Sequence, residues 1–255
     1  MLSSLPDPPE IFEPPEPPRS PWTFADLVVF GFLFAVTVLF LPLGMFFVMQ
    51  TFRPGLQLAD LTAVDQVVMS AAADIALVGC IMFLVKVVHG RSFRETIHWR
   101  RDYAFSTGSL ISLGITLAIT VLIVSSLFPP VDTPIEKMLS TMKSLYVFVI
   151  FGVALAPLFE EIIFRGFLFK VFTDLGGPSV AIPLTSVLFA LLHAQQLWGS
   201  WAGIALIFCV GFVLSVIRQR TNSVIPSLIV HVSYNAMLFG VYALSTLVQK
   251  SPVPK

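Results

Sequence analysis

Long apolar runs separated by short polar connections occupy most of the chain after Trp22. A membrane-spanning helix needs about 20 consecutive apolar residues. The apolar runs lie near residues 24–48, 66–88, 107–128, 144–170, 180–196, 201–217 and 223–247. The fifth run is short, and the fourth is long enough to be a broken pair of helices. The pattern predicts an all-α fold, a polytopic transmembrane helical bundle with about seven helices.

Composition supports a membrane protein and excludes some partners. The 255 residues are 56% hydrophobic and 12% charged, with a mean hydropathy of +0.88, whereas soluble domains carry about 25% charged residues. The net charge is +0, so the chain has no long-range field for nucleic acid and none is expected as a partner. Cys80 and Cys209 lie in apolar runs without CxxC spacing and are predicted to be small buried hydrophobes.

The chain divides into three parts by composition. Residues 1–22 hold eight of the 19 prolines and predict a disordered tail without signal-peptide features. Its PxxP spacings allow a ligand for an aromatic groove, but a solvated spacer is favoured. Residues 23–143 are expected to hold N-terminal transmembrane helices and a basic interfacial loop, and residues 144–248 the remaining transmembrane helices.

Lysine and arginine in the short connections predict the orientation. Two connections carry them, after the second and the sixth runs: Lys86, Arg91, Arg94, Arg100 and Arg101, then Arg218 and Arg220. Both lie on one side if the runs alternate, so that side and the N-terminus are predicted to be cytoplasmic, with the C-terminus outside. The expected location is the plasma membrane. Residues 90–108 also carry aromatic side chains and are either an interfacial segment on anionic headgroups or a plain basic loop.

Ionisable residues inside the apolar runs are few, and each is costly at membrane depth. Glu161 and Arg165 are four residues apart, so on a helix they share a face and are predicted to form an ion pair. Glu160 points about 100° away from Glu161 and is the freer carboxylate. A carboxylate of this kind suits a general base.

Two later runs each add polar groups. "FALLH" places Phe189 and His193 four residues apart, and "HVSYN" does the same for His231 and Asn235. Each alone could be a hydrogen-bonding group between helices, which is the reading favoured for Asp74. Glu160, His193, His231 and Asn235 together are harder to explain in that way, and they would converge only if their three helices pack together.

The set of residue types narrows the chemistry. GxSxG and HExxH are absent, which argues against a nucleophile elbow and a zincin helix. A carboxylate with two imidazoles can activate water and stabilise an oxyanion, with or without a metal. The expected reaction is hydrolysis of an amide inside the bilayer.

The three motifs resemble those of the CPBP family (CAAX prenyl protease, Abi and bacteriocin-processing intramembrane endopeptidases), which includes the type II CAAX prenyl endopeptidase. The family pattern is EExxxR, FxxxH and HxxxN on separate helices. It is matched here by Glu160 to Arg165, Phe189 to His193, and His231 to Asn235. The resemblance covers about residues 144–247, so it implies that residues 144–248 are the catalytic core. It also implies a bundle of seven to eight helices.

The resemblance also implies roles for these residues. Glu160 would activate water, His193 would help to hold it, and His231 with Asn235 would support the oxyanion. Glu161, Arg165 and Phe189 would be structural supports. If a metal such as zinc binds, its ligands would be Glu160, His193 and His231, but a metal-independent mechanism is favoured.

The expected partners are membrane lipid and a peptide or protein substrate that enters from the bilayer or the cytoplasmic side. Whether the substrate is prenylated stays open. The alternative function is a non-enzymatic membrane protein, an immunity factor or a transporter-like binder, whose polar cluster is structural.

Overall fold

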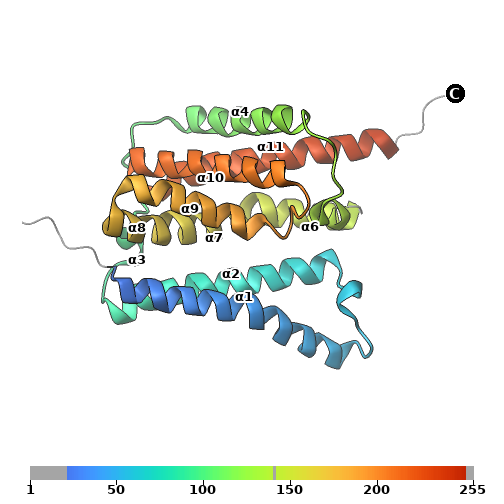
Figure 1. Cartoon of the computed structure of the whole chain (residues 1–255), viewed down its shortest axis with the longest axis horizontal. Helices are drawn as coiled ribbons and strands as arrows, with labels where there is room; N and C mark the ends of the chain where they lie inside the picture. Colours follow the sequence, from blue (N-terminus) through green and yellow to red (C-terminus); the bar gives the residue numbers. More distant parts are fainter. Residues whose placement is uncertain (1–21, 140–141, 251–255) are drawn as a thin grey trace, which may run out of the picture.

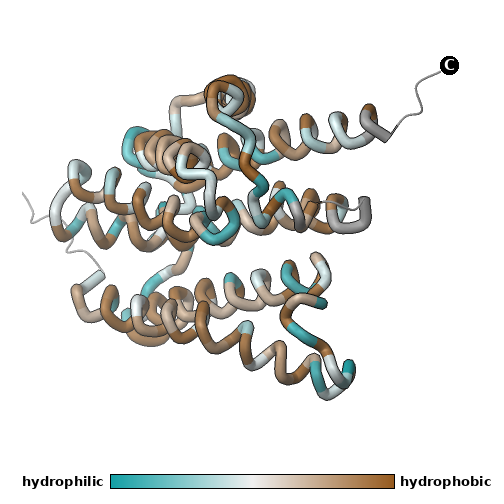
Figure 2. Tube along the Cα trace, turned by 45° about the vertical axis from the view of Figure 1, so that its right-hand side comes forward, coloured by the Kyte–Doolittle hydropathy of each residue, from teal (hydrophilic) through white to brown (hydrophobic). Residues whose placement is uncertain are grey.

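The computed structural model describes residues 22–139 and 142–250, and every regular element in these two ranges is helical. Within these two ranges, six helical segments are long and apolar enough to cross a membrane, and Figure 2 shows apolar residues along them. They are Phe24–Phe52, Ala63–Val88, Thr107–Ser125, Leu145–Gly176, Trp201–Thr221 and Val224–Thr246. A shorter apolar helix, α9 (Pro178–His193), corresponds to the short fifth run. The predicted all-α polytopic bundle is confirmed, and the predicted tail at residues 1–22 lies outside the described residues except for Trp22.

Successive apolar segments run in alternating directions through the bundle (Figure 1). The first pair is α1 (Phe24–Phe52) and α2 (Ala63–Phe83), which η2 (Leu84–Val88) extends as a π-helix. The remaining elements outside the fourth run are η1 (Leu58–Asp60), α3 (Phe93–Thr96), α4 (Thr107–Ser125), α5 (Pro134–Met138), α10 (Trp201–Thr221) and α11 (Val224–Lys250). The start of α1 and the end of α11 lie at opposite ends of the bundle, as the count of seven segments predicted.

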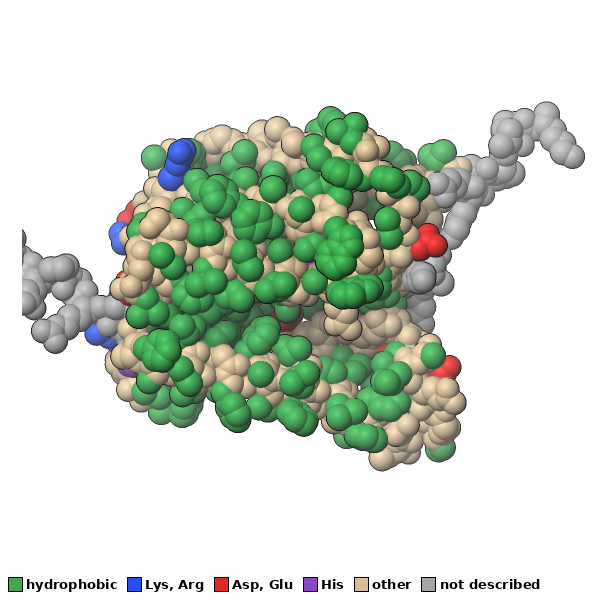
Figure 3. Space-filling model, in the orientation of Figure 1, with side chains coloured by type: hydrophobic (Ala, Val, Ile, Leu, Met, Phe, Trp, Pro, Cys, Tyr) green, Lys and Arg blue, Asp and Glu red, His purple; other side chains and the backbone are tan. Residues whose placement is uncertain are grey.

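The two basic connections meet at one end of the molecule. The Ser223 hydroxyl donates to the Arg100 carbonyl over 2.6 Å, and the Val224 N–H donates to the His98 carbonyl over 3.1 Å. This confirms that both connections lie on the same side. On the face drawn in Figure 3, apolar side chains cover the middle, and the visible Lys and Arg side chains lie at this end.

The segment between α2 and α4 is packed more tightly onto the protein than a plain basic loop or a purely interfacial segment would be. Ile97 is 1% exposed and belongs to the main core. It lies against Gly166, where an added Cβ would come within 3.0 Å of the Ile97 Cβ. A residue without a side chain at position 166 therefore allows this connection to dock against the fourth helical run.

The fourth run is one continuous helical segment, so the possibility of a broken pair was wrong. Its parts are α6 (Met142–Ile150), η3 (Phe151–Leu155), α7 (Ala156–Glu160), η4 (Glu161–Leu168) and α8 (Phe169–Gly176), of which η3 and η4 are π-helical. Pro157 lacks an N–H and follows η3 closely. A π-helical turn absorbs the missing hydrogen bond without ending the helix.

The helices around this central run hold it from two sides. The α1–α2 pair is anchored through Trp22 and Phe30, whose rings each lie 4.6 Å from the ring of Phe167. On the other side α4 packs against α11 (Figure 1). Thus α4, from the expected N-terminal part, supports a helix of the expected core, while the division near residue 143 stays a prediction.

Candidate active site

The centre of the site is a buried ion pair on η4. Arg165 Nη1 lies 3.1 Å from Glu161 Oε1, and both side chains are fully buried. The spacing of four residues predicted this pair, and the structure confirms it. The local helix is π-helical rather than α-helical, but residues four apart still lie on one face. Glu161 is therefore neutralised within its own helix.

Arg165 also ties η4 to two neighbouring helices. Its Nη2 donates to the Gly211 carbonyl of α10 over 2.9 Å, and its guanidinium lies 4.6 Å from the ring centroid of Phe189 on α9. An added Cβ at Gly211 would lie 3.2 Å from the Phe189 ring and 3.3 Å from Ser186 Cα. Gly211 therefore permits the close approach of α9 and α10 that places Phe189 over the guanidinium.

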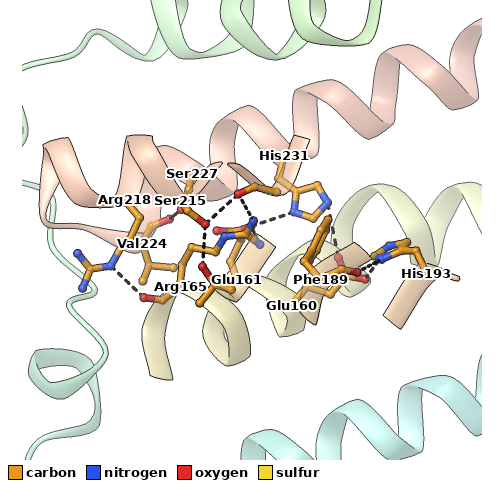
Figure 4. A network of polar contacts seen from close by, with 12 residues as sticks. Glu160, Glu161, Arg165, Phe189, His193, Ser215, Arg218, Val224, Ser227 and His231 are labelled. Atoms are coloured by element: carbon orange, nitrogen blue, oxygen red, sulfur yellow. Dashed lines mark hydrogen bonds and ion pairs between the residues drawn. The ribbon is translucent and has the colours of Figure 1, made fainter. Parts of the chain in front are cut away.

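His231 of α11 connects the two glutamates, and it is 2% exposed. Its Nδ1 lies 3.0 Å from Glu161 Oε1, and its Nε2 lies 3.6 Å from Glu160 Oε2 (Figure 4). Because an ionised carboxylate only accepts, Nδ1 carries the hydrogen in this pair. The imidazole is thus oriented by Glu161 and presents Nε2 to Glu160.

His193 reaches Glu160 from the end of α9. Its Nδ1 donates to the Phe189 carbonyl over 2.8 Å, and its Nε2 lies 4.0 Å from Glu160 Oε1. The Phe189 ring separates the two imidazoles, with centroid distances of 4.6 Å to His193 and 5.7 Å to His231. Phe189 therefore supports both histidines as well as Arg165.

Glu160 lies between the two imidazoles, and its side chain is 15% exposed. The separations of 4.0 Å to His193 and 3.6 Å to His231 are too long for direct hydrogen bonds. They leave room for one water molecule that bridges the carboxylate and an imidazole. The convergence that the sequence could not establish is present for Glu160, His193 and His231.

Comparison with known proteins identifies the family of the chain. A family model described as "Type II CAAX prenyl endopeptidase Rce1-like" matches residues 142–237. The UPF0177 protein YxdF of Lactococcus lactis subsp. lactis (strain IL1403) is 33% identical over 153 residues, which are 60% of this chain and 80% of that protein. The chain belongs to the Rce1-like, CPBP family. No solved structure matches it.

Family membership fixes the general class of the protein. It is a CAAX-type intramembrane protease, and the six long apolar helices in the part of the chain that the structure describes make it an integral, multi-pass membrane protein. It therefore works in a lipid environment on a peptide substrate. The three CPBP motifs lie on the fourth helical run, on α9 and on α11, and their side chains make contacts between these helices.

Asn235 of the CPBP motif on α11 makes a contact between helices. Its Nδ2 donates to the Gly152 carbonyl of η3 over 2.7 Å, and the side chain is half-buried. An added Cβ at Gly152 would lie 2.8 Å from the Phe239 ring, so Gly152 brings η3 close to α11. One N–H of the amide is thus used for packing, and its second N–H remains for another acceptor.

The residues that would ligate a metal are not arranged for one. Within residues 22–139 and 142–250, no group of three or more His, Cys, Asp and Glu side chains is placed to hold a metal ion. Both histidines use Nδ1 for other hydrogen bonds, His231 to Glu161 and His193 to the backbone, so their Nε2 atoms are the ones that face Glu160. We therefore derive no step of the reaction through a metal.

Sequence reasoning missed two residues near the site. Gly211 and Arg218 on α10 both contact Arg165, the first through its carbonyl and the second through its side chain. A glycine in an apolar helix is a signal of close helix approach, but the position of Arg218 indicated only a basic connection. The role expected for Asp74 of α2, a hydrogen-bonding group between helices, stays a prediction.

Proposed function

We propose that this protein is an intramembrane endopeptidase in which Glu160 activates the water that attacks a peptide carbonyl. The proposal rests on one observation, the different contacts that the two adjacent glutamates make. Glu161 is engaged by Arg165 at 3.1 Å and by His231 at 3.0 Å. Glu160 is left with two imidazole nitrogens at distances suited to a shared water molecule.

The geometry supports a specific position for the water. A water between Glu160 Oε1 and His193 Nε2 donates one hydrogen to each, because the Nδ1 of His193 already carries the hydrogen given to the Phe189 carbonyl. One lone pair of the water oxygen is then free to attack the carbonyl carbon. Glu160 accepts a proton during the attack and returns it to the leaving amine, so the protons balance over the reaction.

The oxyanion that forms needs hydrogen-bond donors in a site of low dielectric constant. His231 can donate through Nε2 in its doubly protonated form, since Nδ1 is already committed to Glu161. The second N–H of Asn235 is the other candidate donor, because its first is bound to Gly152. Both residues lie on α11 and would act from the same side of the substrate.

The test is cleavage by the protein reconstituted in liposomes. Two internally quenched peptides, one with a farnesylated CaaX end and one identical except for a free cysteine, report whether a prenyl group is required. A library of membrane-inserted peptides, analysed by mass spectrometry, extends the search to other sequences. We expect Glu160→Gln to abolish cleavage while the melting temperature stays near that of the wild type.

Glu95→Gln provides a matched control, because Glu95 is exposed and is not among the residues of the site, and it should cleave like the wild type. Cleavage by Glu160→Gln at the wild-type rate would refute the proposal. So would a library in which the wild type cleaves nothing, which instead favours the non-enzymatic alternative.

The proposed location is the plasma membrane with the N-terminus in the cytoplasm. Support comes from the end of the bundle where both basic connections and the start of α1 gather, since such residues are enriched on the cytoplasmic side. In a variant without Cys80 and Cys209, a cysteine placed at Arg94 should be labelled only from the cytoplasmic side of sealed vesicles. Labelling from outside alone would reverse the orientation.

A further inference from the structure

Arg218 lies near the end of α10 and is buried, although its position in the sequence predicts a basic residue in a cytoplasmic connection. Only 2% of its surface is exposed. A buried guanidinium is unfavourable unless its N–H groups find acceptors. Its contacts therefore indicate why the fold keeps an arginine at this position.

The hydrogen bonds of Arg218 go to neutral acceptors. Its Nε donates to the Arg165 carbonyl over 2.9 Å, and its Nη1 donates to Asn222 Oδ1 over 3.2 Å. Its guanidinium lies 5.4 Å from the ring centroid of Phe169. Figure 4 shows the side chain reaching from α10 to the backbone of η4. Arg218 thus binds the backbone of the residue whose side chain holds Glu161.

The Arg165 carbonyl needs such a donor because of the change in helix type. The end of η4 is marked by the bond from the Phe169 N–H to the Phe164 carbonyl, five residues back, and α8 then follows the α-helical pattern. In a π-helix each N–H bonds to the carbonyl five residues back, and in an α-helix to the carbonyl four residues back. Where the first pattern changes to the second, one carbonyl receives no N–H from its own helix. The Arg165 carbonyl lies at this change, and a buried carbonyl without a partner is unfavourable.

α10 therefore holds Arg165 at both ends. The Gly211 carbonyl accepts from the Arg165 guanidinium over 2.9 Å, and Arg218 donates to the Arg165 carbonyl. Gly211 and Arg218 are seven residues apart, which is about two helical turns, so they lie on one face of α10. Between these two contacts, Arg165 is held in place to bind Glu161.

We propose that Arg218 is a positioning residue for peptide-bond hydrolysis, and this inference rests on the proposed function. It fixes the backbone of η4 so that Arg165 holds Glu161, and Glu161 in turn orients the His231 imidazole at 3.0 Å. Arg218 does not touch the reacting atoms. Loss of Arg218 would therefore displace the His231 imidazole and would not remove a reacting group.

The test compares Arg218→Met and Arg218→Lys with the matched control Arg220→Met, in the liposome assay with whichever peptide the wild type cleaves. A misplacement of about 1 Å can lower a rate about 100-fold, so we expect kcat of Arg218→Met to fall about 10–100-fold. KM should stay within about twofold, because substrate binding is untouched. Arg218→Lys should be intermediate, since an ammonium can reach the carbonyl but lacks the guanidinium fork. Arg220 is exposed, and Arg220→Met should behave like the wild type.

The measurement is turnover per folded molecule, with a melting curve for each variant. A lowered melting temperature with unchanged kcat would mean that Arg218 is only structural and would overturn the inference. If Arg218→Met does not fold, Asn222→Gly decides the matter. It removes the second anchor of Arg218 while glycine keeps the left-handed conformation at φ +47. We expect kcat of Asn222→Gly to fall about threefold or more, and an unchanged kcat would overturn the inference.

Failure of this inference is distinguishable from failure of the proposed function. If Glu160→Gln is inactive while Arg218→Met turns over like the wild type, only the positioning role is wrong. If Glu160→Gln is fully active, the proposed function itself is wrong.

Discussion

Replacing Arg165 by methionine should destabilise the protein strongly while leaving its helices intact. Methionine keeps much of the length of the side chain and its contact with the Phe189 ring, which lies 4.6 Å from the guanidinium. It removes the charge that lies 3.1 Å from Glu161 and the donor to the Gly211 carbonyl. Glu161 is fully buried and would lose its charged partner.

The magnitude follows from the contacts that are lost. Breaking a buried ion pair by removing one partner typically costs about 3–5 kcal/mol. The Gly211 carbonyl still accepts a hydrogen bond from the Ser215 hydroxyl over 2.8 Å. The loss of the hydrogen bond from Arg165 therefore adds little to the destabilisation. His231 remains 3.0 Å from Glu161 and can partly compensate its charge. We therefore expect a loss of about 4 kcal/mol, which lowers the melting temperature by roughly 8–16 °C for a chain of this size.

The assay is thermal unfolding of the purified protein, with Arg220→Met as the exposed control. The double variant Glu161→Gln with Arg165→Met removes both charges and should recover about half of the loss, because a neutral pair leaves no uncompensated buried charge. An Arg165→Met variant within about 1 kcal/mol of the wild type would refute the reasoning. A double variant less stable than the single one would refute it as well.

Three further predictions concern packing, the oxyanion and pH. Gly114→Ala should cost about 3 kcal/mol in unfolding experiments, because the added Cβ would lie 2.5 Å from the Val230 carbonyl oxygen; Gly44→Ala, with nothing within 4 Å, is the control. Asn235→Ala should lower kcat per folded molecule about 100–1000-fold if the second N–H of Asn235 supports the oxyanion. An unchanged kcat with a lower melting temperature would mean that Asn235 only stabilises the fold through its contact with Gly152. Burial, with the nearby Arg218 as the next cause, lowers the pKa of His98 to about 4, from 6.5. The unfolded chain therefore binds the proton more readily between these values, so stability should rise from about pH 4 to about pH 6.5, and a melting series should show a flatter dependence for His98→Asn.

Local spacing along the chain determined the parts of this protein that depend on one helix at a time. The apolar runs predicted the helical segments, including the short α9, since length and hydropathy are properties of each segment alone. The pairing of Glu161 with Arg165 followed from their separation by four residues, because helix geometry fixes which side chains share a face. The assignment of Glu160 as the free carboxylate had the same origin.

Only the tertiary structure decided how the helices meet. The distances from Glu160 to His193 and His231 depend on the rotation and depth of three helices, which no local pattern encodes. The burial of Arg218 depends on a carbonyl left open where η4 becomes α-helical, and a basic residue near a helix end gives no sign of this. An apolar helix surface is about equally stable against lipid and against another helix. Hydropathy therefore predicts that a segment spans the membrane but not which helix it contacts.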